Sequence, residues 1–339
     1  MTPSETSILI TGASGFIGSF LVEEALERGM QVWAAVRPTS SRRWLTDARI
    51  HFIELDLQNE EHLAAQLVRH TSVHGPWQYV VHAAGATKCR CDADFFRTNT
   101  DGTLRLARQL LATSSLAGRF VFISSLSVCG PLHEADYVPF SAADTPQPNT
   151  AYGRSKLQAE EGLAKIDGLD YIVLRPTGVY GPRERDYFLM AKSIANHVDF
   201  SVGYRRQTIT FIYVRDLVQA AFLPLTRGNR GDMFFLSDGG EYASTDFSHL
   251  LQRAMGTRFV LHVCAPVWVL RLVCAVSGWW AKIHKRAATL NPDKCRIMKQ
   301  RSWRCDIQPA CDVLGYEPHF PLSRGVEETV AWYKDNEWI

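Results

Sequence analysis

Short apolar runs alternate with longer mixed segments along the first half of this chain. The runs are typical of buried strands in a parallel sheet, and the segments between them place apolar residues at helical spacing. We predict strands at residues 7–11, 31–36, 50–54, 78–82, 119–124 and 170–174, and helices near 16–28, 60–69, 93–113 and 151–165. Strands and helices that alternate in this order form a doubly wound parallel sheet, which is an α/β fold.

The pattern becomes irregular beyond about Gly181, with short helices, scattered aromatic residues and a strand pair near 208–214 and 233–236. Open α/β sheets bind ligands at the carboxyl ends of their strands. We therefore predict a dinucleotide-binding domain over 1–178, with a returning segment near 208–237. A smaller C-terminal substrate lobe should take most of 179–339.

Composition narrows the class of protein. The chain has 339 residues, of which 46% are hydrophobic and 21% charged, which is enough for a large core and two lobes. Its net charge of +2 gives no electrostatic reason to expect a nucleic-acid partner. The eight cysteines show no Cys-x-x-Cys spacing, so we expect reduced thiols and no metal site. The polar N-terminus leaves no room for a signal peptide, which predicts a cytoplasmic protein.

A glycine-rich turn follows the first predicted strand. Gly12, Gly15 and Gly18 permit a tight turn into a helix and a close approach of backbone amides to a pyrophosphate. The helix that begins near Phe16 points its N-terminus at the phosphates. With a second strand following in the required order, the segment predicts a Rossmann-type dinucleotide site.

A pair of residues suited to proton transfer lies in a later helical segment. Tyr152 and Lys156 are four residues apart and project from one face of a helix. An ammonium beside a phenol favours the phenolate, so we expect Lys156 to lower the pKa of Tyr152. The Ser125 hydroxyl can share the proton or hold a substrate oxygen. These groups suit proton transfer at a carbon that gains or loses a hydride.

Other polar residues near these motifs have simpler alternatives. Asn99, at the start of a predicted helix, either positions active-site water or serves as a capping or packing amide. His82 at a strand end is expected to be structural rather than catalytic. We expect Lys88 and Arg90 to be solvated loop cations rather than contacts for an acidic substrate.

The chain resembles the extended short-chain dehydrogenases/reductases, also called the NAD-dependent epimerase/dehydratase family. The matching segments follow the family's order over nearly the whole chain: Thr11 to Gly18, Asp56-Leu57, His82 to Gly85, Asn99 to Thr103, Ser124 to Gly130, Tyr152 to Lys156, Leu174 to Pro176, Gly181-Pro182, Phe211 to Asp216 and Leu314 to Pro318. This resemblance implies that Tyr152 is the catalytic acid/base, that Lys156 also holds the nicotinamide ribose, and that Ser125 orients the substrate oxygen.

The resemblance also implies a cofactor site and an assembly. The cofactor-binding positions are Gly12, Ser14, Gly15, Phe16, Ile17, Gly18, Asp56, Leu57, Ala83, Ala84, Gly85, Tyr152, Lys156, Pro176, Thr177 and Val179. Asp56 and Leu57 would flank the adenine, and Ala83 to Gly85 would line the central part of the cofactor. A homodimer built on the helices predicted at 93–113 and 151–165 is the expected assembly.

Departures from the family's pattern indicate the substrate. Gly178 replaces an asparagine that serves the sugar nucleotide in nucleotide-sugar epimerases, and Ile209 replaces an arginine for the diphosphate. Losing that charge-assisted contact removes on the order of 1.5–3 kcal/mol of recognition. Leu126-Ser127 also lacks the acidic pair of the sugar dehydratases.

The sequence is therefore closer to the 3β-hydroxysteroid dehydrogenase and dihydroflavonol reductase branch, with a small apolar cyclic, steroid-like substrate. We expect an oxidoreductase that interconverts a secondary alcohol and a ketone; the alternative is a nucleotide-sugar 4-epimerase. Substrate contacts are expected from Thr87, Ser127, Tyr187 and Phe188.

The end of the second strand indicates which nicotinamide is used. NAD-preferring enzymes place an acid there for the ribose hydroxyls, whereas this chain has Arg37, with Ser40, Ser41 and Arg42 close behind. A guanidinium suits the 2′-phosphate of NADP through paired hydrogen bonds. We predict a preference for NADP(H), with NAD(H) as the alternative.

The segment from Pro266 to Ile283 is apolar but is interrupted by Arg271, Gly278 and Lys282. It is too short and too charged for a comfortable membrane span. Three interpretations stay open: a helix buried in the substrate lobe, a lid over an apolar pocket, or a helix on a membrane surface. In the third, residues 266–286 would make peripheral contact with the membrane, and the cations near the end of this range would add attraction.

Overall fold

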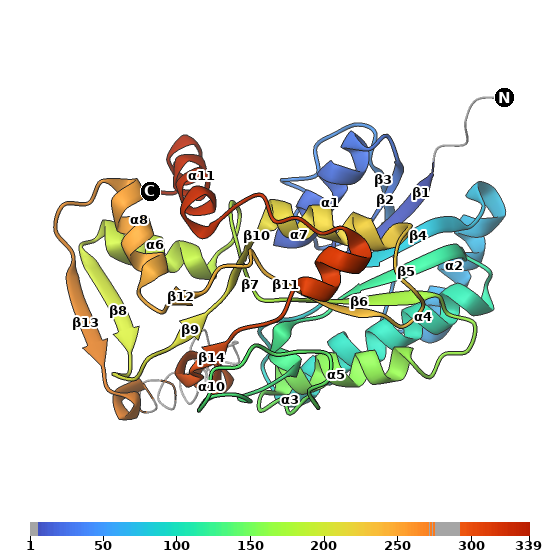
Figure 1. Ribbon diagram of the computed structural model, residues 1–339. Helices are drawn as coiled ribbons and strands as arrows, with labels where there is room; N and C mark the ends of the chain where they lie inside the picture. Colours follow the sequence, from blue (N-terminus) through green and yellow to red (C-terminus); the bar gives the residue numbers. More distant parts are fainter. Residues whose placement is uncertain (1–5, 271, 273, 275–291) are drawn as a thin grey trace.

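A seven-stranded parallel sheet forms the centre of the first lobe (Figure 1). The computed structural model describes residues 6–270, 272, 274 and 292–339. The strands are β1 (Ser7–Thr11), β2 (Gln31–Val36), β3 (His51–Glu54), β4 (Trp77–His82), β5 (Leu116–Ile123), β6 (Tyr171–Pro176) and β11 (Met233–Leu236). They lie in the order β11-β6-β5-β4-β1-β2-β3, which confirms the predicted doubly wound fold.

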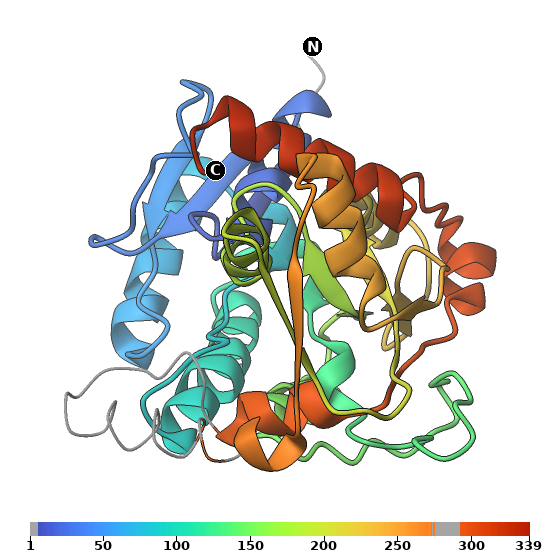
Figure 2. The ribbon, with the colours of Figure 1, turned by 90° about the vertical axis from the view of Figure 1, so that its left-hand side faces the viewer.

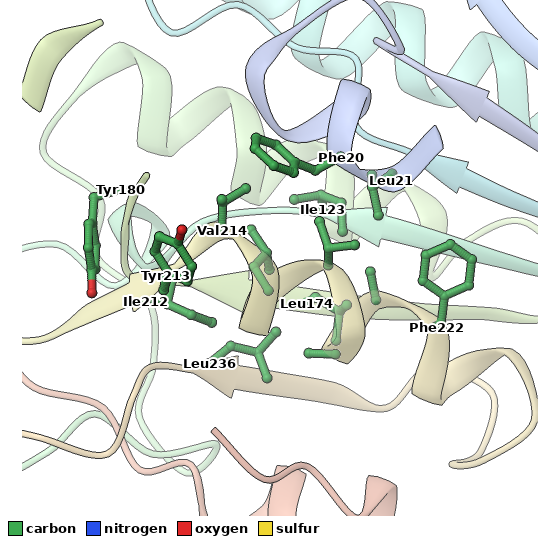
Figure 3. Close-up of a cluster of buried hydrophobic side chains, with 14 of the residues drawn as sticks. Phe20, Leu21, Ile123, Leu174, Tyr180, Ile212, Tyr213, Val214, Phe222 and Leu236 are labelled. Atoms are coloured by element: carbon green, nitrogen blue, oxygen red, sulfur yellow. The ribbon is translucent and has the colours of Figure 1, made fainter. Parts of the chain in front are cut away.

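Helices cover both faces of this sheet because its strands are apolar on both sides. The principal helices of this lobe are α1 (Phe16–Glu27), α2 (Glu60–His74), α3 (Asp92–Phe95), α4 (Gly102–Ala112), α5 (Ala151–Leu163) and α7 (Val214–Phe222). One core joins α1 and α7 to the sheet, with Phe20, Leu174 and Val214 among its residues (Figure 3). The other core packs α2, α4 and α5 against the opposite face.

The second lobe is built from short strands and helices around the carboxyl ends of the main sheet. The strands form three small sheets: β7 (Gly178–Tyr180) with β10 (Phe211–Tyr213), β8 (Val198–Val202) with β13 (Leu261–Ala265), and β9 (Thr208–Ile209) with β12 (Tyr242–Ala243) and β14 (Ser302–Trp303). The helices are α6 (Asp186–Ala195), α8 (Asp246–Met255), α10 (Pro292–Lys299) and α11 (Leu322–Asp335). Further described elements are short 3₁₀ helices at Leu126–Val128 and Leu223–Leu225 and π-helical segments at Phe96–Asp101 and Ala310–Leu314.

Two predicted elements differ from the structure. The helix expected over 93–113 is not continuous: a π-helical stretch at Phe96–Asp101 separates α3 from α4. The strands expected near 208–214 and 233–236 do not pair with each other. Instead, β10 pairs with β7, while β11 joins the edge of the main sheet beside β6. Period-2 patterns indicate a strand but not its partner, which explains the second error.

The segment over 266–286, for which three interpretations were open, falls largely on residues 271, 273 and 275–286, outside the described residues. Among the helices that the structure does describe, none is both long enough and apolar enough to cross a bilayer.

Candidate active site

The predicted glycine turn forms a cradle between β1 and α1 that only glycine fits. Gly12 has a φ of 68°, and a Cβ there would lie 2.7 Å from the amide nitrogen of Ala84. A Cβ on Gly18 would overlap the carbonyl oxygen of Gly12. The N-cap of α1 is Gly15, which supplies no side-chain hydrogen bond, so the first amides of the helix remain open to an anion. The turn therefore fits the pyrophosphate of a dinucleotide.

The end of β4 brings the second predicted cofactor segment beside this turn. The amides of Ala83 and Ala84 donate to the backbone and side-chain oxygens of Thr11, each at 3.3 Å. A Cβ on Gly85 would lie 3.2 Å from Nζ of Lys156 and 3.3 Å from Oδ1 of Asn99. Glycine at this position thus leaves room for a ligand to approach both polar side chains.

The three predicted catalytic residues lie where β5 ends and α5 begins. Thr150 caps α5 by accepting a hydrogen bond from the Gly153 amide at 3.0 Å, which fixes the first turn that carries Tyr152. Ser125 accepts a hydrogen bond from the Ser127 amide at 3.1 Å. Lys156 is buried and its Nζ donates to the Ile123 carbonyl at 2.8 Å. The end of β5 thereby holds the lysine that α5 presents.

The electrostatics of this group differ from the expectation that Lys156 lowers the pKa of Tyr152. Burial raises the pKa of Tyr152, and the Ser125 hydroxyl opposes that rise. Burial also lowers the pKa of Lys156 to about 8, with Glu160 opposing the shift. Desolvation penalises the charged form of both groups, so Tyr152 holds its proton at neutral pH while Lys156 remains largely an ammonium.

Asn99 and His82 have well-defined partners. Asn99 lies in the π-helical stretch, where its side chain accepts from the Ala86 amide at 2.7 Å and donates to the Ala86 carbonyl and to Ser155, each at 3.0 Å. It thus ties the loop after β4 to α5. His82 bridges the hydroxyls of Thr11 and Thr103 at 2.7 and 2.9 Å, and burial, with Lys156 adding to it, lowers the pKa of His82 to about 3. His82 is therefore a neutral structural histidine.

A buried ion pair supports the site and was missed by the sequence analysis. Arg175 of β6 contacts Glu160 of α5 at 2.5 Å, and their side chains are 8% and 9% exposed. Ser124, beside the predicted catalytic residue Ser125, also donates to Glu160. The signal that could have revealed the pair is spacing, because Glu160 follows Lys156 by one helical turn on the same face.

A cavity of about 310 Å³ opens from Ser125 into the second lobe. Its walls are mainly apolar and include Leu126, Met190, Ile209, Phe247, Met298 and Trp303. None of the described residues that line it is a lysine or an arginine, and its one carboxylate, Asp199, is paired with His262 at 3.0 Å.

The predicted substrate residues separate into two groups. Ser127 and Tyr187 line the cavity, as do Pro176 and Thr177, which were assigned to the cofactor. Thr87 is exposed and does not line it. Phe188 also lies elsewhere, because its ring packs against Tyr333 and Trp338 with centroids 5.3 and 4.7 Å apart. Adjacent residues on a helix point about 100° apart, which explains why only one of the two α6 aromatics reaches the cavity.

Two positions that distinguish the family's branches can now be placed. A Cβ on Gly178 would lie 2.5 Å from the hydroxyl of Tyr187, so that hydroxyl fills the space where a longer side chain would stand. Ile209 lies in the cavity wall. Where a nucleotide-sugar epimerase is expected to carry an asparagine and an arginine, this chain therefore places the Tyr187 hydroxyl beside Gly178 and the aliphatic side chain of Ile209 in the cavity wall.

Three further predicted cofactor residues, Arg37, Asp56 and Leu57, follow the strands β2 and β3. Arg37 is exposed directly after β2, and its amide donates to Ser40 at 3.1 Å. Arg42 stacks over the Phe52 ring with its guanidinium 4.3 Å from the centroid. Asp56 accepts from the Gln58 amide at 3.0 Å, and the Leu57 carbonyl accepts from Arg105 at 2.5 Å. Val179 packs against the first core and does not line the cavity.

A scan against protein families matches residues 8–236 to the model described as the NAD dependent epimerase/dehydratase family. Curated relatives include a UDP-glucose 4-epimerase of Vibrio cholerae, 27% identical over 95% of this chain and 94% of that protein. A sterol-4-alpha-carboxylate 3-dehydrogenase, decarboxylating, of Dictyostelium discoideum is 22% identical over 95% of this chain and 99% of its own length. A ceramide reductase of Caulobacter vibrioides is 24% identical over 100% of this chain and 98% of its own length.

Solved structures share the fold. DesIV, a dTDP-glucose 4,6-dehydratase from Streptomyces venezuelae solved with NAD and TYD bound, superposes with a TM-score of 0.77 at 21% identity. The match covers 98% of each chain.

Proposed function

This chain belongs to the NAD-dependent epimerase/dehydratase family, and on that premise we propose that it interconverts a secondary alcohol and a ketone on an apolar, lipid-like substrate. A steroid-like ring system is the substrate that the sequence favours. A long-chain lipid ketone is the second candidate, because a ceramide reductase matches the full length of this chain.

The observation that carries this proposal is the chemistry of the cavity next to Ser125. A nucleoside diphosphate needs cationic partners, and no described residue of the cavity wall supplies one. The Tyr187 hydroxyl occupies the space beside Gly178, and Ile209 stands in the wall. Burying apolar surface favours an apolar ligand by about 25 cal/mol per Å². The same wall would leave a diphosphate charge without a partner, which is costly.

The catalytic residues support proton transfer at the substrate oxygen. A bound nicotinamide cofactor supplies or accepts the hydride at the carbon. Ser125 lies in the cavity wall and orients the carbonyl oxygen by hydrogen bonding. Tyr152, which burial keeps protonated, donates its proton to that oxygen as the hydride arrives, and takes a proton back in the reverse direction. Lys156 holds the cofactor ribose and places positive charge near the phenol.

We further propose that NADP(H) is the preferred cofactor. Arg37 stands exposed at the end of β2, where the adenosine ribose of a dinucleotide lies in folds of this type. Its guanidinium can donate two parallel hydrogen bonds to a 2′-phosphate.

Net cofactor turnover tests the proposed function. Purified protein is mixed with NADPH or NADH and, in turn, a sterol ketone, a long-chain keto-lipid in detergent, and UDP-glucose. We expect oxidation of the cofactor with a lipid ketone and none with UDP-glucose. Epimerisation of UDP-glucose without net turnover, together with inert lipid ketones, would overturn the proposal.

The variant Tyr152→Phe tests the chemical role. It removes only the hydroxyl, so kcat should fall by about a hundredfold or more while cofactor binding is retained. Tyr187→Phe is a matched control in the cavity wall and should alter KM more than kcat. A Tyr152→Phe enzyme with near wild-type kcat would exclude Tyr152 as the acid/base.

A further inference from the structure

An exposed apolar surface lies at the end of the second lobe, over β8 and β13. We call it the β8–β13 surface and define it by Phe200, Tyr204, Phe259, Leu261 and Trp268, whose exposed fractions lie between 54% and 76%. Twelve large apolar side chains are exposed in the described part of the chain, and all four aromatic rings among them belong to this surface. Rings gathered in this way mark a contact surface rather than chance exposure.

Strand pairing places two of these side chains on the same side of the β8–β13 pair, and a hydrogen bond holds a third segment beside them. Leu261 pairs in register with Val198, and Phe200 with Val263, so Leu261 and Phe200 lie on the same side of the strand pair. Phe259 is held beside this side because its carbonyl hydrogen-bonds His197 at 2.7 Å. The side chain of the next residue, Val260, is buried, whereas the side chains of Phe259 and Leu261 on either side of it are exposed. Burial of Val260 therefore fixes this part of the chain with its two neighbours facing solvent.

The other end of the surface is equally well fixed. The Tyr204 hydroxyl donates to the Cys264 carbonyl at 3.3 Å, and the Gly203 amide donates to the Ala265 carbonyl at 2.9 Å. A Cβ on Gly203 would lie 3.5 Å from Val267, the neighbour of Trp268. Tyr204 and Trp268 are the chain neighbours of these two residues, and they are of the two residue types that prefer the boundary between water and lipid.

Positive charge flanks the surface. Arg205 and Arg206 follow Tyr204, Arg258 precedes Phe259, and all three are exposed. The ion pairs between described residues include none of these three arginines. Arg206 lies over the Tyr137 ring with its guanidinium 5.5 Å from the centroid. Apolar rings flanked by arginines match an anionic lipid surface in both hydrophobicity and charge.

The surface also adjoins the cavity. Phe200 belongs to both, and Val202 of the same strand lines the cavity wall. The β8–β13 pair stands at the left end of Figure 1, far from α2, and faces the viewer in Figure 2. We propose that the β8–β13 surface docks onto an anionic lipid bilayer and presents the cavity to it. The proposed docking depends on the exposed residues of the β8–β13 surface and not on which substrate the enzyme converts.

Flotation with lipid vesicles tests the proposal. The full chain is mixed with phosphatidylcholine vesicles, or with vesicles in which part of that lipid is replaced by phosphatidylglycerol. We expect binding to the anionic vesicles that weakens with salt. Each arginine near the surface contributes about 1 kcal/mol, or about fivefold in affinity, so replacing Arg205, Arg206 and Arg258 by Gln should cost up to about a hundredfold.

A second variant separates the apolar contribution. Replacing Phe259, Leu261 and Trp268 by Ser should weaken binding at least about tenfold even at low salt. The matched control replaces Val68 and Val73 of α2, which are 53% and 70% exposed, by Ser, and should bind as the wild type does. Reduction of a water-soluble ketone without vesicles should be unchanged in both variants.

The results of these measurements show whether the β8–β13 surface binds a lipid bilayer or a second copy of the chain. Absence of binding to anionic vesicles, or equal loss in the α2 control, would overturn the proposal. Light scattering adds one further outcome: a dimer that the Ser variant converts to a monomer would assign the surface to a second copy of the chain. If vesicle binding persists while no ketone is reduced, the proposed function fails and the docking surface stands.

Discussion

At the scale of single residues, burial sets the chemistry of the site. Tyr152 and Lys156 are four residues apart on α5, and desolvation acts on both in opposite directions. Desolvation raises the pKa of the phenol and lowers that of the ammonium, so the neutral form of each group is favoured. The sequence identifies Tyr152 and Lys156 as a pair, but the direction of each pKa shift depends on how deeply the folded protein buries the two side chains.

The pH dependence of cofactor binding follows from the lysine. Burial lowers the pKa of Lys156 to about 8, so the side chain is a cation below that pH and neutral above it. Because an ammonium donates stronger hydrogen bonds to a ribose than an amine does, the cofactor dissociation constant should increase as the pH rises through about 8. Quenching of intrinsic fluorescence by the cofactor measures it. Lys156→Met should bind weakly with no such pH dependence, and a flat wild-type profile would contradict the assignment.

The proposed preference for NADP(H) can be tested at Arg37. Arg37→Ala removes a charge-assisted contact with the 2′-phosphate and leaves contacts to a bare ribose unchanged. We expect kcat/KM for NADPH to fall about tenfold or more, and that for NADH to change little. Arg69→Ala, on the exposed side of α2, is a control that should leave both values unaltered. Equal kcat/KM for the two cofactors in the wild type would refute the preference.

At the scale of elements, the contact between α5 and β6 positions the helix that carries Tyr152 and Lys156. Glu160 sits one turn beyond Lys156 and pairs with Arg175 at 2.5 Å, with both side chains buried. Ser124 at the end of β5 donates to the same carboxylate. Three elements that each carry a site residue are thereby joined through one carboxylate.

Removing that carboxylate charge should destabilise the fold. Glu160→Gln leaves the Arg175 guanidinium buried without its counter-ion, at a cost of about 3–5 kcal/mol in the free energy of unfolding. Urea denaturation followed by circular dichroism measures it. Glu161→Gln, one residue away and exposed, should change stability by less than about 0.5 kcal/mol. A Glu160→Gln protein as stable as this control would show that the pair contributes little.

At the scale of the whole molecule, the two lobes contribute different parts of the candidate site. The lobe built on the parallel sheet carries the glycine turn and the predicted catalytic residues, while the smaller lobe supplies an apolar cavity wall and the β8–β13 surface. All eight cysteines are free thiols. The homodimer expected through 93–113 and 151–165 stays a prediction, and the light-scattering measurement described for the β8–β13 surface also reports on it.

Much of this molecule follows from local sequence. The glycines at 12, 15 and 18 permit a tight strand-to-helix turn, and the spacing of Tyr152 and Lys156 places both on one helix face. Both features depend on residues close together in the chain. The order of strands and helices predicted the parallel sheet for the same reason. These features rest on backbone geometry and periodicity.

Tertiary structure alone decided the features that join distant segments. The Tyr187 hydroxyl fills the space beside Gly178, Phe188 turns away to Trp338, and Arg175 meets Glu160 across two elements. The pKa directions of Tyr152 and Lys156 likewise come from the packing around them. Such contacts depend on how elements pack in three dimensions, and burial and cavity shape are properties of that packing rather than of any local run of residues.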